Sequence, residues 1–336
     1  MDKKLMLAVA GAGKTTHIIN NLSTEKRTLI VTYTIGNYNN LLEKISAKFN
    51  GECPENVTVM KYFSFLYSFC YKPFLSDRIR AKGIIYKNNP NQFAKQSERK
   101  YYLSKDDYFY SNRLSLFLEK AQIIPLIKAR LETYFDEFIV DEVQDIAGRD
   151  FLFLEQLMSA NINMLFVGDF FQHTFDTSRD GNVNSNLFEN QNTYIARYTN
   201  KGIVCDRTTL ISSYRCSQNV CRFINDMLGI SIASNRTDAD NTEISFVSEA
   251  AECSRILADP QIIKLHYQNG HRYGSGHKNW GETKGEDCYG DVCVLFNKNT
   301  ARKHAAGKLS ELPASTRNKL YVAITRAHGN VYFINE

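Results

Sequence analysis

Short apolar runs alternate with amphipathic segments along this chain, and that alternation predicts an α/β fold with parallel sheets. In the first half, the pattern predicts strands at residues 4–9, 28–32, 57–59, 138–140 and 163–168. It predicts helices at residues 15–22, 38–49, 63–69, 114–134 and 150–158. Ligands of such sheets bind at the carboxyl ends of the strands, so the residues that follow each strand are the candidates for chemistry.

A second α/β pattern follows in the other half of the chain. Strands are predicted at residues 208–211, 244–247, 292–296 and 331–334, with a helix at 218–228. The polar stretch 176–198 is predicted to be a linker, which gives a first domain of residues 1–178 and a second of residues 179–336. Residues 71–112 are basic and rich in tyrosine, and we expect them to form a small irregular insertion in the first domain. A chain of 336 residues is long enough for two such domains.

Composition excludes some classes of protein. No run of about 18 apolar residues occurs, so we expect no transmembrane helix and no membrane partner. The start of the chain does not resemble a signal peptide, and eight cysteines at this length are typical of a reducing compartment, so a cytoplasmic location is expected. Two C-x4-C pairs, Cys216 with Cys221 and Cys288 with Cys293, leave a zinc site open as an alternative.

Charge and aromatic content bear on partners. The net charge of +5, from 41 basic and 36 acidic residues, permits nucleic-acid binding but does not indicate it. The chain has 21 phenylalanines and 19 tyrosines, of which most are expected in the core and some could stack on bases. His266, His271 and His277 lie in a glycine-rich polar stretch, which predicts a solvated loop there.

A phosphate-binding loop stands close to the start of the sequence. Residues 8–16 read Ala-Val-Ala-Gly-Ala-Gly-Lys-Thr-Thr between a predicted strand and a predicted helix. In that context, backbone N–H groups of the loop face phosphates, Lys14 reaches the β- and γ-phosphates, and the Thr15 hydroxyl binds Mg²⁺. The strict pattern has glycine where this chain has Ala8. The loop residues expected to bind ATP are Ala10, Gly11, Ala12, Gly13, Lys14, Thr15 and Thr16.

Acidic side chains follow the predicted strand at residues 138–140. The string Asp141-Glu142-Val143-Gln144-Asp145 supplies an acid that can share Mg²⁺ and a base that can activate water. We therefore expect Asp141 to be a metal ligand and Glu142 to be the general base. A charged strand end is common by itself, but it becomes informative downstream of a Gly-Lys-Thr loop.

Three further polar residues complete a hydrolytic set. Gln172 follows the predicted strand 163–168 and is placed to hydrogen-bond the γ-phosphate or the attacking water. Arg215 and Arg326 lie in the second half of the chain, where an arginine presented to a γ-phosphate would stabilise the charge of the transition state. Either arginine could instead form a structural ion pair.

Six strings then occur in one order: Ala-Gly-Ala-Gly-Lys-Thr, Asp-Glu-Val-Gln-Asp, Gly-Asp-Phe-Phe-Gln, Ser-Tyr-Arg-Cys-Ser, Thr-Lys-Gly-Glu and Leu-Tyr-Val-Ala-Ile-Thr-Arg-Ala. This series resembles the motifs of UvrD-like superfamily 1 helicases, and the resemblance extends from residue 5 to residue 334. It implies two RecA-like P-loop NTPase domains, with ATP hydrolysed in the cleft between them and single-stranded nucleic acid crossing both.

The resemblance also assigns residues to ATP. It implies that Lys14, Thr15, Asp141, Glu142, Gln172, Arg215 and Arg326 carry hydrolysis. Tyr214 matches an aromatic that packs on the adenine, and Thr283, Lys284 and Gly285 match a motif that links nucleotide to strand binding. The acidic residue that contacts ribose in this family falls on Asp287, with Glu286 beside it.

Nucleic-acid contacts are implied at fewer positions. Tyr33 and Thr34 match a segment whose aromatic meets a base, and Phe63 and Ser64 match the next strand-contacting segment. Phe175 matches a family aromatic, and Thr283 belongs to the shared motif described above. The tryptophan that the family places two residues after Phe175 is replaced by Thr177. The single tryptophan, Trp280, is open to either a compensating role or a packing role.

Spacing then limits what the resemblance implies. Residues 215–284 leave no room for the large helical subdomain that full-length relatives carry there, and few residues precede the phosphate loop, so the adenine-reading glutamine motif is expected to be missing. The leading hypothesis is a compact helicase or translocase on single-stranded DNA, with RNA as the other substrate, driven by ATP and Mg²⁺. The alternative is an ATP-gated binding or assembly module with a nuclease or other protein partner. A small-molecule P-loop kinase leaves the second half of the chain unexplained.

Overall fold

The computed structural model describes residues 1–91, 93–174, 183–237 and 242–336, and its contacts divide the chain into two compact units. The first unit comprises Met1–Met6, Thr15–Gly168 and Phe175–Asp206. The second comprises Leu7–Lys14, Asp169–Thr174 and Arg207–Glu336. Because the units are interleaved along the sequence, they do not test the expected domain boundary after residue 178, which stays a prediction.

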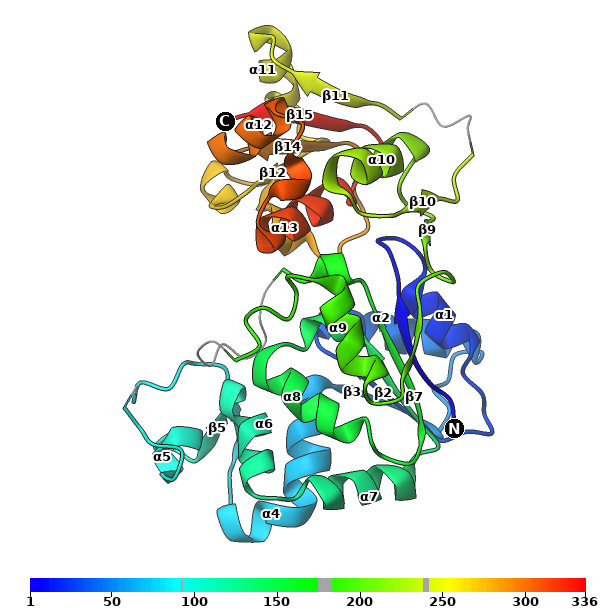
Figure 1. Cartoon of the computed structure of the whole chain (residues 1–336), viewed down its shortest axis with the longest axis vertical. Coiled ribbons are helices and arrows are strands. Elements are labelled where there is room, and N and C mark those ends of the chain that lie inside the picture. The colour runs from blue at the N-terminus through cyan, green and yellow to red at the C-terminus, as the bar shows by residue number, and fades with distance from the viewer. Residues whose placement is uncertain (92, 175–182, 238–241) are drawn as a thin grey trace. The chain divides into compact units, whose positions relative to one another are not determined.

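The first unit contains a six-stranded sheet in the order β3-β2-β6-β7-β1-β8. The strands are β1 (Lys3–Leu7), β2 (Thr28–Thr32), β3 (Val57–Lys61), β6 (Glu137–Asp141), β7 (Asn163–Gly168) and β8 (Val204–Asp206). The pairs β2–β3, β2–β6, β6–β7 and β1–β8 are parallel. Figure 1 shows α8 (Gly148–Leu157) and α9 (Gln191–Thr199) in front of this sheet. The parallel register brings the carboxyl ends of the strands to one edge.

The remaining helices of the first unit are α1 (Lys14–Asn20), α2 (Ile35–Lys48), α3 (Tyr62–Ser64), α4 (Lys72–Ile79), α5 (Arg99–Tyr102), α6 (Ser111–Lys120) and α7 (Ile124–Tyr134). A π-helical segment, Phe65–Tyr71, joins α3 to α4, so the helix predicted at 63–69 continues to residue 79. The insertion predicted to be irregular contains a parallel strand pair, β4 (Gly83–Ile85) and β5 (Tyr108–Tyr110). Its aromatic residues supply the core that gives it this order.

The second unit contains a five-stranded sheet in the order β11-β15-β14-β12-β13, with every pair parallel. Its strands are β11 (Ile244–Val247), β12 (Ile263–His266), β13 (His277–Asn279), β14 (Val292–Phe296) and β15 (Val331–Asn335). Its helices are α10 (Gln218–Phe223), α11 (Ala250–Ala258), α12 (Lys298–Ala305) and α13 (Ala314–Ile324). A small parallel pair, β9 (Ser212–Ser213) and β10 (Ala233–Ser234), precedes this sheet in the chain. Both sheets confirm the α/β class and the parallel pairing.

Three sequence-based expectations are wrong in detail. The single helix predicted at 114–134 is two helices, because Gln122 has φ 58° and Pro125, which has no N–H, lies in the first turn of α7. The strand predicted at 208–211 is absent, and the chain there runs between β8 and β9. The linker predicted at 176–198 lies outside the described residues up to residue 182, and its last part belongs to α9, because Tyr194 and Tyr198 lie four residues apart and bury one face.

The histidine-rich stretch also differs from the prediction of a solvated loop. His266 is buried in β12, and His277 lies in the neighbouring strand β13. The His266 Nε2 atom lies 2.9 Å from Nδ1 of His277, and its Nδ1 atom lies 2.7 Å from Oε1 of Glu336. Buried polar side chains are tolerated where they have partners. Because these strands contain polar histidines, the hydrophobic pattern did not predict β12 and β13.

Phe138 provides a test of the core of the first unit. Its ring is buried in β6, with its centroid 5.7 Å from that of Phe65 and 6.5 Å from that of Phe166. Phe138→Ala should lower the free energy of unfolding by about 3–5 kcal/mol, because the deletion leaves a cavity. Urea denaturation followed by circular dichroism measures this loss. Leu126→Ala, at a half-exposed position of α7, is the control and should change stability by less than about 0.5 kcal/mol. Equal stability of both variants would contradict this packing.

Candidate functional site

The phosphate loop follows β1, and its shape depends on glycine. Gly11 and Gly13 have φ values of 70° and 80°, a region that residues with a Cβ atom rarely adopt. A Cβ atom at Gly11 would lie 2.7 Å from Cβ of Arg215 and 2.7 Å from Oγ of Ser213. The backbone N–H of Tyr214 also donates to the Gly11 carbonyl at 2.9 Å. The loop is therefore held closely against residues 213–215, all within the second unit.

A buried tyrosine connects the loop to Asp169. The Ala10 N–H donates to the Tyr321 hydroxyl at 2.9 Å, and that hydroxyl donates to Oδ2 of Asp169 at 3.0 Å. Oδ2 of Asp169 also accepts a hydrogen bond from Nε2 of Gln172 at 2.9 Å, and Oδ1 accepts from the Phe171 N–H at 3.1 Å. Burial, together with the Asp169 charge, raises the pKa of Tyr321 well above its ordinary value. Tyr321 is therefore a neutral bridge, and Gln172 is held at a fixed position relative to the loop.

The acidic residues after β6 form a second arrangement, in the first unit. Glu142 has φ 54° and ψ 46°, a left-handed conformation that is uncommon for a residue with a side chain. The Gln144 amide donates a short hydrogen bond to Oε2 of Glu142. A Cβ atom at Gly168 would clash with Oε1 of the buried Gln144 and would lie 3.2 Å from the Val143 backbone nitrogen, so glycine leaves room for that amide at the end of β7. Gln144 therefore fixes the Glu142 carboxylate.

A hydroxyl and a carboxylate are available for a divalent cation. Thr15 lies in the first turn of α1, and Asp141 ends β6 as a buried residue. Both supply hard oxygen ligands, which Mg²⁺ prefers. This donor set fits Mg²⁺ better than zinc. Among the described residues, no cluster of three or more His, Cys, Asp and Glu side chains is arranged to hold a metal ion, so the zinc alternative has no ligand set.

Arg215 is paired with the carboxylate that was predicted to contact ribose. Its Nε atom lies 2.5 Å from Oδ1 of Asp287, and one terminal nitrogen donates to the Thr325 carbonyl at 3.0 Å. His328 contacts the same Asp287 oxygen, with Nε2 at 2.7 Å. Burial alone would raise the pKa of Asp287, but the hydrogen bonds and charges of Arg215 and His328 together outweigh burial, so the pKa lies below its ordinary value. Asp287 is therefore an anion that holds Arg215.

Arg326 is buried among backbone carbonyls. Its guanidinium donates to the carbonyl oxygens of Val322 at 3.1 Å, Glu286 at 2.9 Å and Thr283 at 3.4 Å. Burial, and then the nearby charge of Arg215, lower the pKa of Arg326 to about 10, which still leaves it protonated at neutral pH. The guanidinium therefore ties the segment at residues 283–286 to α13.

The predicted site residues of segment 283–286 differ from one another in burial. Thr283 is fully buried, and its hydroxyl donates to the Trp280 carbonyl at 3.0 Å. Trp280 is also fully buried, and its indole N–H donates to the Leu265 carbonyl at 2.9 Å. The packing role therefore holds for Trp280, and the alternative of a base-stacking tryptophan is wrong. Lys284 is partly exposed, and Gly285 has φ 84°.

The residues expected to contact nucleic acid lie in several settings. Tyr33 and Phe63 contact one another, with ring centroids 5.7 Å apart. The Thr34 hydroxyl accepts a hydrogen bond of 3.1 Å from a backbone N–H in the first turn of α2, so it caps that helix. Ser64 ends α3 and is partly exposed. Phe175 lies outside the described residues.

The structure connects Gly11 to Arg215 and the loop to Gln172 within the second unit. In the first unit, Thr15 lies in the first turn of α1, and Asp141 and Glu142 lie at the end of β6. Tyr214, the expected adenine contact, is exposed. The sequence reading assigned no role to Gln144, Asp169 or Tyr321, although each stands inside a quoted motif string. A polar side chain next to apolar residues within each string was the signal that could have identified them.

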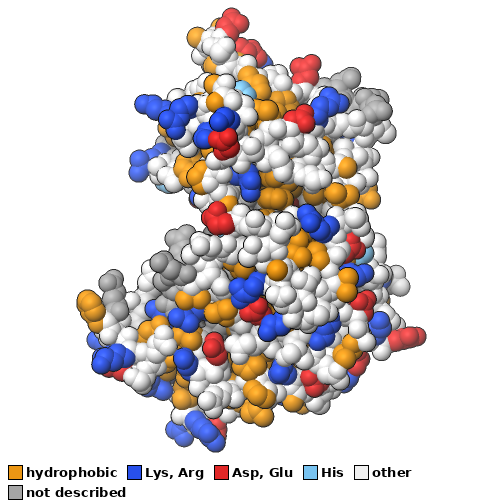
Figure 2. Space-filling model, in the orientation of Figure 1, with side chains coloured by type: hydrophobic (Ala, Val, Ile, Leu, Met, Phe, Trp, Pro, Cys, Tyr) orange, Lys and Arg blue, Asp and Glu red, His pale blue; other side chains and the backbone are white. Residues whose placement is uncertain are grey.

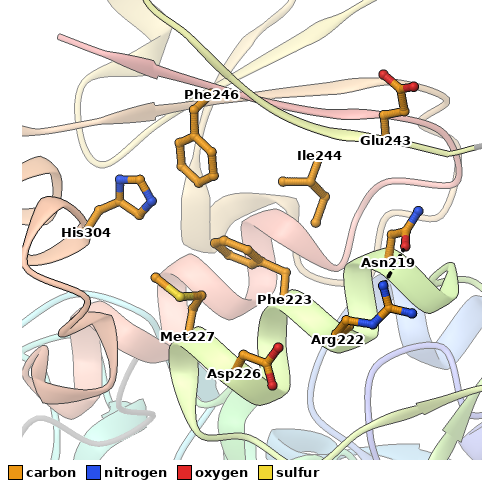
Figure 3. Close-up of a pocket in the computed structure, with 9 residues that line it drawn as sticks. All are labelled: Asn219, Arg222, Phe223, Asp226, Met227, Glu243, Ile244, Phe246 and His304. Carbon is orange, nitrogen blue, oxygen red and sulfur yellow. Dashed lines mark hydrogen bonds between the residues drawn. The ribbon is translucent and has the colours of Figure 1, made fainter.

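A separate pocket lies in the second unit between α10, β11 and α12 (Figure 3). Phe223 and Phe246 form part of its lining, and the Phe246 ring stacks on His304 at 4.0 Å between centroids. Its charged lining residues are Arg222, Asp226 and Glu243. None of the expected site residues lines this pocket.

Comparison with known proteins reveals the fold. No family model and no curated protein matches the chain. A crystal structure of arterivirus nonstructural protein 10, a helicase, matches with a TM-score of 0.52 and 15% identity over 98% of this chain and 59% of that one. The same helicase in complex with DNA matches with a TM-score of 0.50 and 16% identity over 98% of this chain and 60% of that one.

This chain thus spans about three-fifths of the length of the solved structures that it matches. With the two parallel sheets described above, the likeness shows an α/β fold with two RecA-like domains. Among the described residues, no helix is both long enough and apolar enough to cross a membrane.

Tyr321→Phe tests the buried bridge. The variant keeps the ring but removes both hydrogen bonds of the hydroxyl, so the Ala10 N–H loses its bond to Tyr321. We expect the free energy of unfolding to fall by about 1–3 kcal/mol, the cost of a lost buried hydrogen bond. Urea denaturation measures it, with Tyr273→Phe, at an exposed position, as the matched control. If the two variants lose the same stability, the Tyr321 hydroxyl does not hold the loop.

Proposed function

We propose that this chain is a nucleic-acid-dependent ATPase of the UvrD-like branch: a minimal superfamily 1 helicase or translocase that acts on single-stranded DNA. Its motif series supports the branch, and its fold supports the class. The eight cysteines form no disulfide, so we place this activity in the reducing cytoplasm. The proposed domains are residues 1–178 and 179–336.

The observation that carries this proposal is the hydrogen-bonded path from the phosphate loop to Gln172. Ala10, Tyr321 and Asp169 form that path with bonds of 2.9 to 3.0 Å. A loop that only turned the chain would not need a buried tyrosine and a buried carboxylate aimed at a glutamine. If nucleotide bound at the loop is to influence the position of the Gln172 amide, the chain needs both the tyrosine and the carboxylate between them.

The proposed hydrolysis divides the chemistry among the residues at the strand ends. Glu142 accepts a proton from the attacking water, and Gln144 keeps its carboxylate in one orientation. Gln172 hydrogen-bonds the same water or the γ-phosphate, and Lys14 neutralises charge on the phosphates. Thr15 and Asp141 would hold Mg²⁺, which neutralises charge on the β- and γ-phosphate oxygens when it is bound.

The two arginines have different proposed roles. Arg215 has a side chain held by Asp287, whose own side chain is mostly exposed, so exchange of that partner for a phosphate is feasible. Arg326 has its nitrogens on three backbone carbonyls and is fully buried. These contacts favour Arg215 as the residue that stabilises transition-state charge. Arg326 then acts by positioning the segment that contains Lys284, Gly285 and Asp287.

Nucleic-acid binding is proposed from two observations. The related arterivirus helicase is known in complex with DNA. In this chain, Tyr33 and Phe63 offer aromatic rings after neighbouring strands. On the face shown in Figure 2, basic and acidic side chains are interspersed rather than gathered into one field. Binding would then depend on local stacking and local cations more than on net charge.

One observation favours limited unwinding. Between Arg215 and Lys284, the chain forms α10, β10, β11, α11, β12 and β13. The strands belong to the two-stranded pair or to the five-stranded sheet of the second unit, and the two helices are short. No accessory subdomain is inserted among the described residues of this interval. The second candidate function is therefore an ATP-gated module that hydrolyses ATP by itself and unwinds duplex only with a nuclease or another protein partner.

Single-stranded DNA should raise the rate of ATP hydrolysis many-fold, because strand binding and hydrolysis share the segment at residues 283–287. An ATPase titration with single-stranded DNA, RNA and duplex DNA measures the effect, and a salt series measures how many phosphates are contacted. A rate that no nucleic acid changes would reject the helicase proposal. Hydrolysis that is stimulated without strand separation would favour the second candidate function.

Lys14→Ala and Glu142→Gln test the site itself. Loss of the general base should lower kcat by roughly 10²–10⁴-fold, and loss of the phosphate-binding lysine should lower it at least roughly a hundredfold. Steady-state release of phosphate in excess Mg²⁺ and ATP measures both. Lys44→Ala and Glu55→Gln alter exposed residues and are the matched controls. Full activity in both site variants would show that the site is assigned wrongly.

A further inference from the structure

A row of three aromatic rings begins at the carboxyl ends of β2 and β3. These strands are parallel neighbours, with Thr32 opposite Lys61, so the residues that follow them emerge at one edge of the sheet. Tyr33 follows β2, and Phe63 follows β3 in the first turn of α3. Their ring centroids are 5.7 Å apart at an interplanar angle of 61°.

The third ring, Tyr86, comes from the insertion. It follows β4 directly, and its centroid lies 5.3 Å from that of Phe63 at an interplanar angle of 77°. Phe63 is only 7% exposed, whereas Tyr86 is 70% exposed. The row therefore runs from the sheet to the surface, and we call Tyr33, Phe63 and Tyr86 the aromatic row.

The Tyr86 ring contacts the Phe63 ring and still remains exposed to solvent. A tyrosine that served only the core of the insertion would be buried, as Tyr101 and Tyr102 of the same insertion are. An exposed tyrosine without a role would not need an edge-to-face contact with a buried ring. The contact fixes the position of the Tyr86 ring before a ligand arrives, which lowers the entropy cost of stacking.

Charges around the aromatic row suit a polyanion at its outer end. Lys61 ends β3 and lies over the ring of Tyr38, and Lys82 and Lys87 flank Tyr86 in sequence as exposed residues. Carboxylates lie at the inner end, where the fully buried Asp145 and Asp150 contribute to a raised pKa of Tyr33, after burial itself. Asp145 and Asp150 are thus buried near Tyr33, whereas Lys82 and Lys87 are exposed and close to Tyr86 in the chain.

We propose that Tyr86 is a base-stacking residue, and that the insertion extends the aromatic row into a platform for the unpaired bases of a single strand. Aromatic rings stack on any base, so the platform recognises single-stranded nucleic acid without preference for sequence. The identity of that ligand rests on the proposed function. Tyr86 then supplies the exposed end of the platform, which the motif series does not include.

The test is the affinity of the whole chain for a fluorescent oligothymidylate, measured by anisotropy. Tyr86→Ala should weaken binding about fivefold to 150-fold, the range for loss of one stacked base. Tyr86→Phe should bind like the unchanged protein, because it keeps the ring. Phe93→Ala removes another aromatic of the same insertion, 95% exposed and outside the aromatic row, and should leave binding unchanged.

An abasic oligonucleotide of the same length separates stacking from a structural role. On that strand, Tyr86→Ala and the unchanged protein should bind equally, because no base is present to stack. A defect that persists there, an unaltered affinity of Tyr86→Ala for oligothymidylate, or an equal loss in Phe93→Ala would each overturn the proposal. Failure of the unchanged protein to bind any nucleic acid would instead reject the proposed function.

Discussion

The Tyr321 hydroxyl is the group that joins the phosphate loop to Asp169 and Gln172 within the second unit. It is fully buried, and it serves at once as the acceptor for the Ala10 N–H and as a donor to Asp169. A hydroxyl has one hydrogen to donate, so donation to the carboxylate leaves its lone pairs for the amide. No other common side chain with a ring offers both functions at that distance from its backbone. The loop and Gln172 are therefore coupled through the Tyr321 hydroxyl and the Asp169 carboxylate.

Steric limits reinforce that coupling at two glycines. Gly11 lies against Arg215 and Ser213, and Gly168 lies under the Gln144 amide, so neither position has room for a Cβ atom. Phosphate-loop glycines are usually explained by the approach of phosphate. In this chain, the close neighbours of Gly11 are protein atoms, and its carbonyl accepts from the Tyr214 N–H. The same small residue thus serves the loop and its protein contacts.

The sequence predicted the strands that are largely apolar and fully buried, such as 28–32 and 292–296, because burial on both faces leaves a strong signal. It did not predict β12 and β13, where His266 and His277 satisfy one another inside the sheet. It placed the loop and acidic residues at strand ends, since motif and context agreed. It could not assign Tyr321, because its partner Ala10 lies more than three hundred positions away in the chain. Long-range polar contacts leave no local pattern.

The two arginines show how burial separates residues that a motif series treats alike. Both were expected to meet the γ-phosphate, and both follow Ser, Thr or Tyr residues in similar strings. Arg326 has its guanidinium on three carbonyls, so moving it to a phosphate would leave those oxygens without their charged donor. Arg215 has an ionic partner, Asp287, that is itself largely exposed and also contacts His328. If Arg215 leaves, Asp287 can be solvated and keeps its contact with His328, and one backbone carbonyl, that of Thr325, loses its charged donor. The exchange therefore costs less than moving Arg326, which would deprive three carbonyls. The fixed cation therefore suits a positioning role, and the exchangeable one suits catalysis.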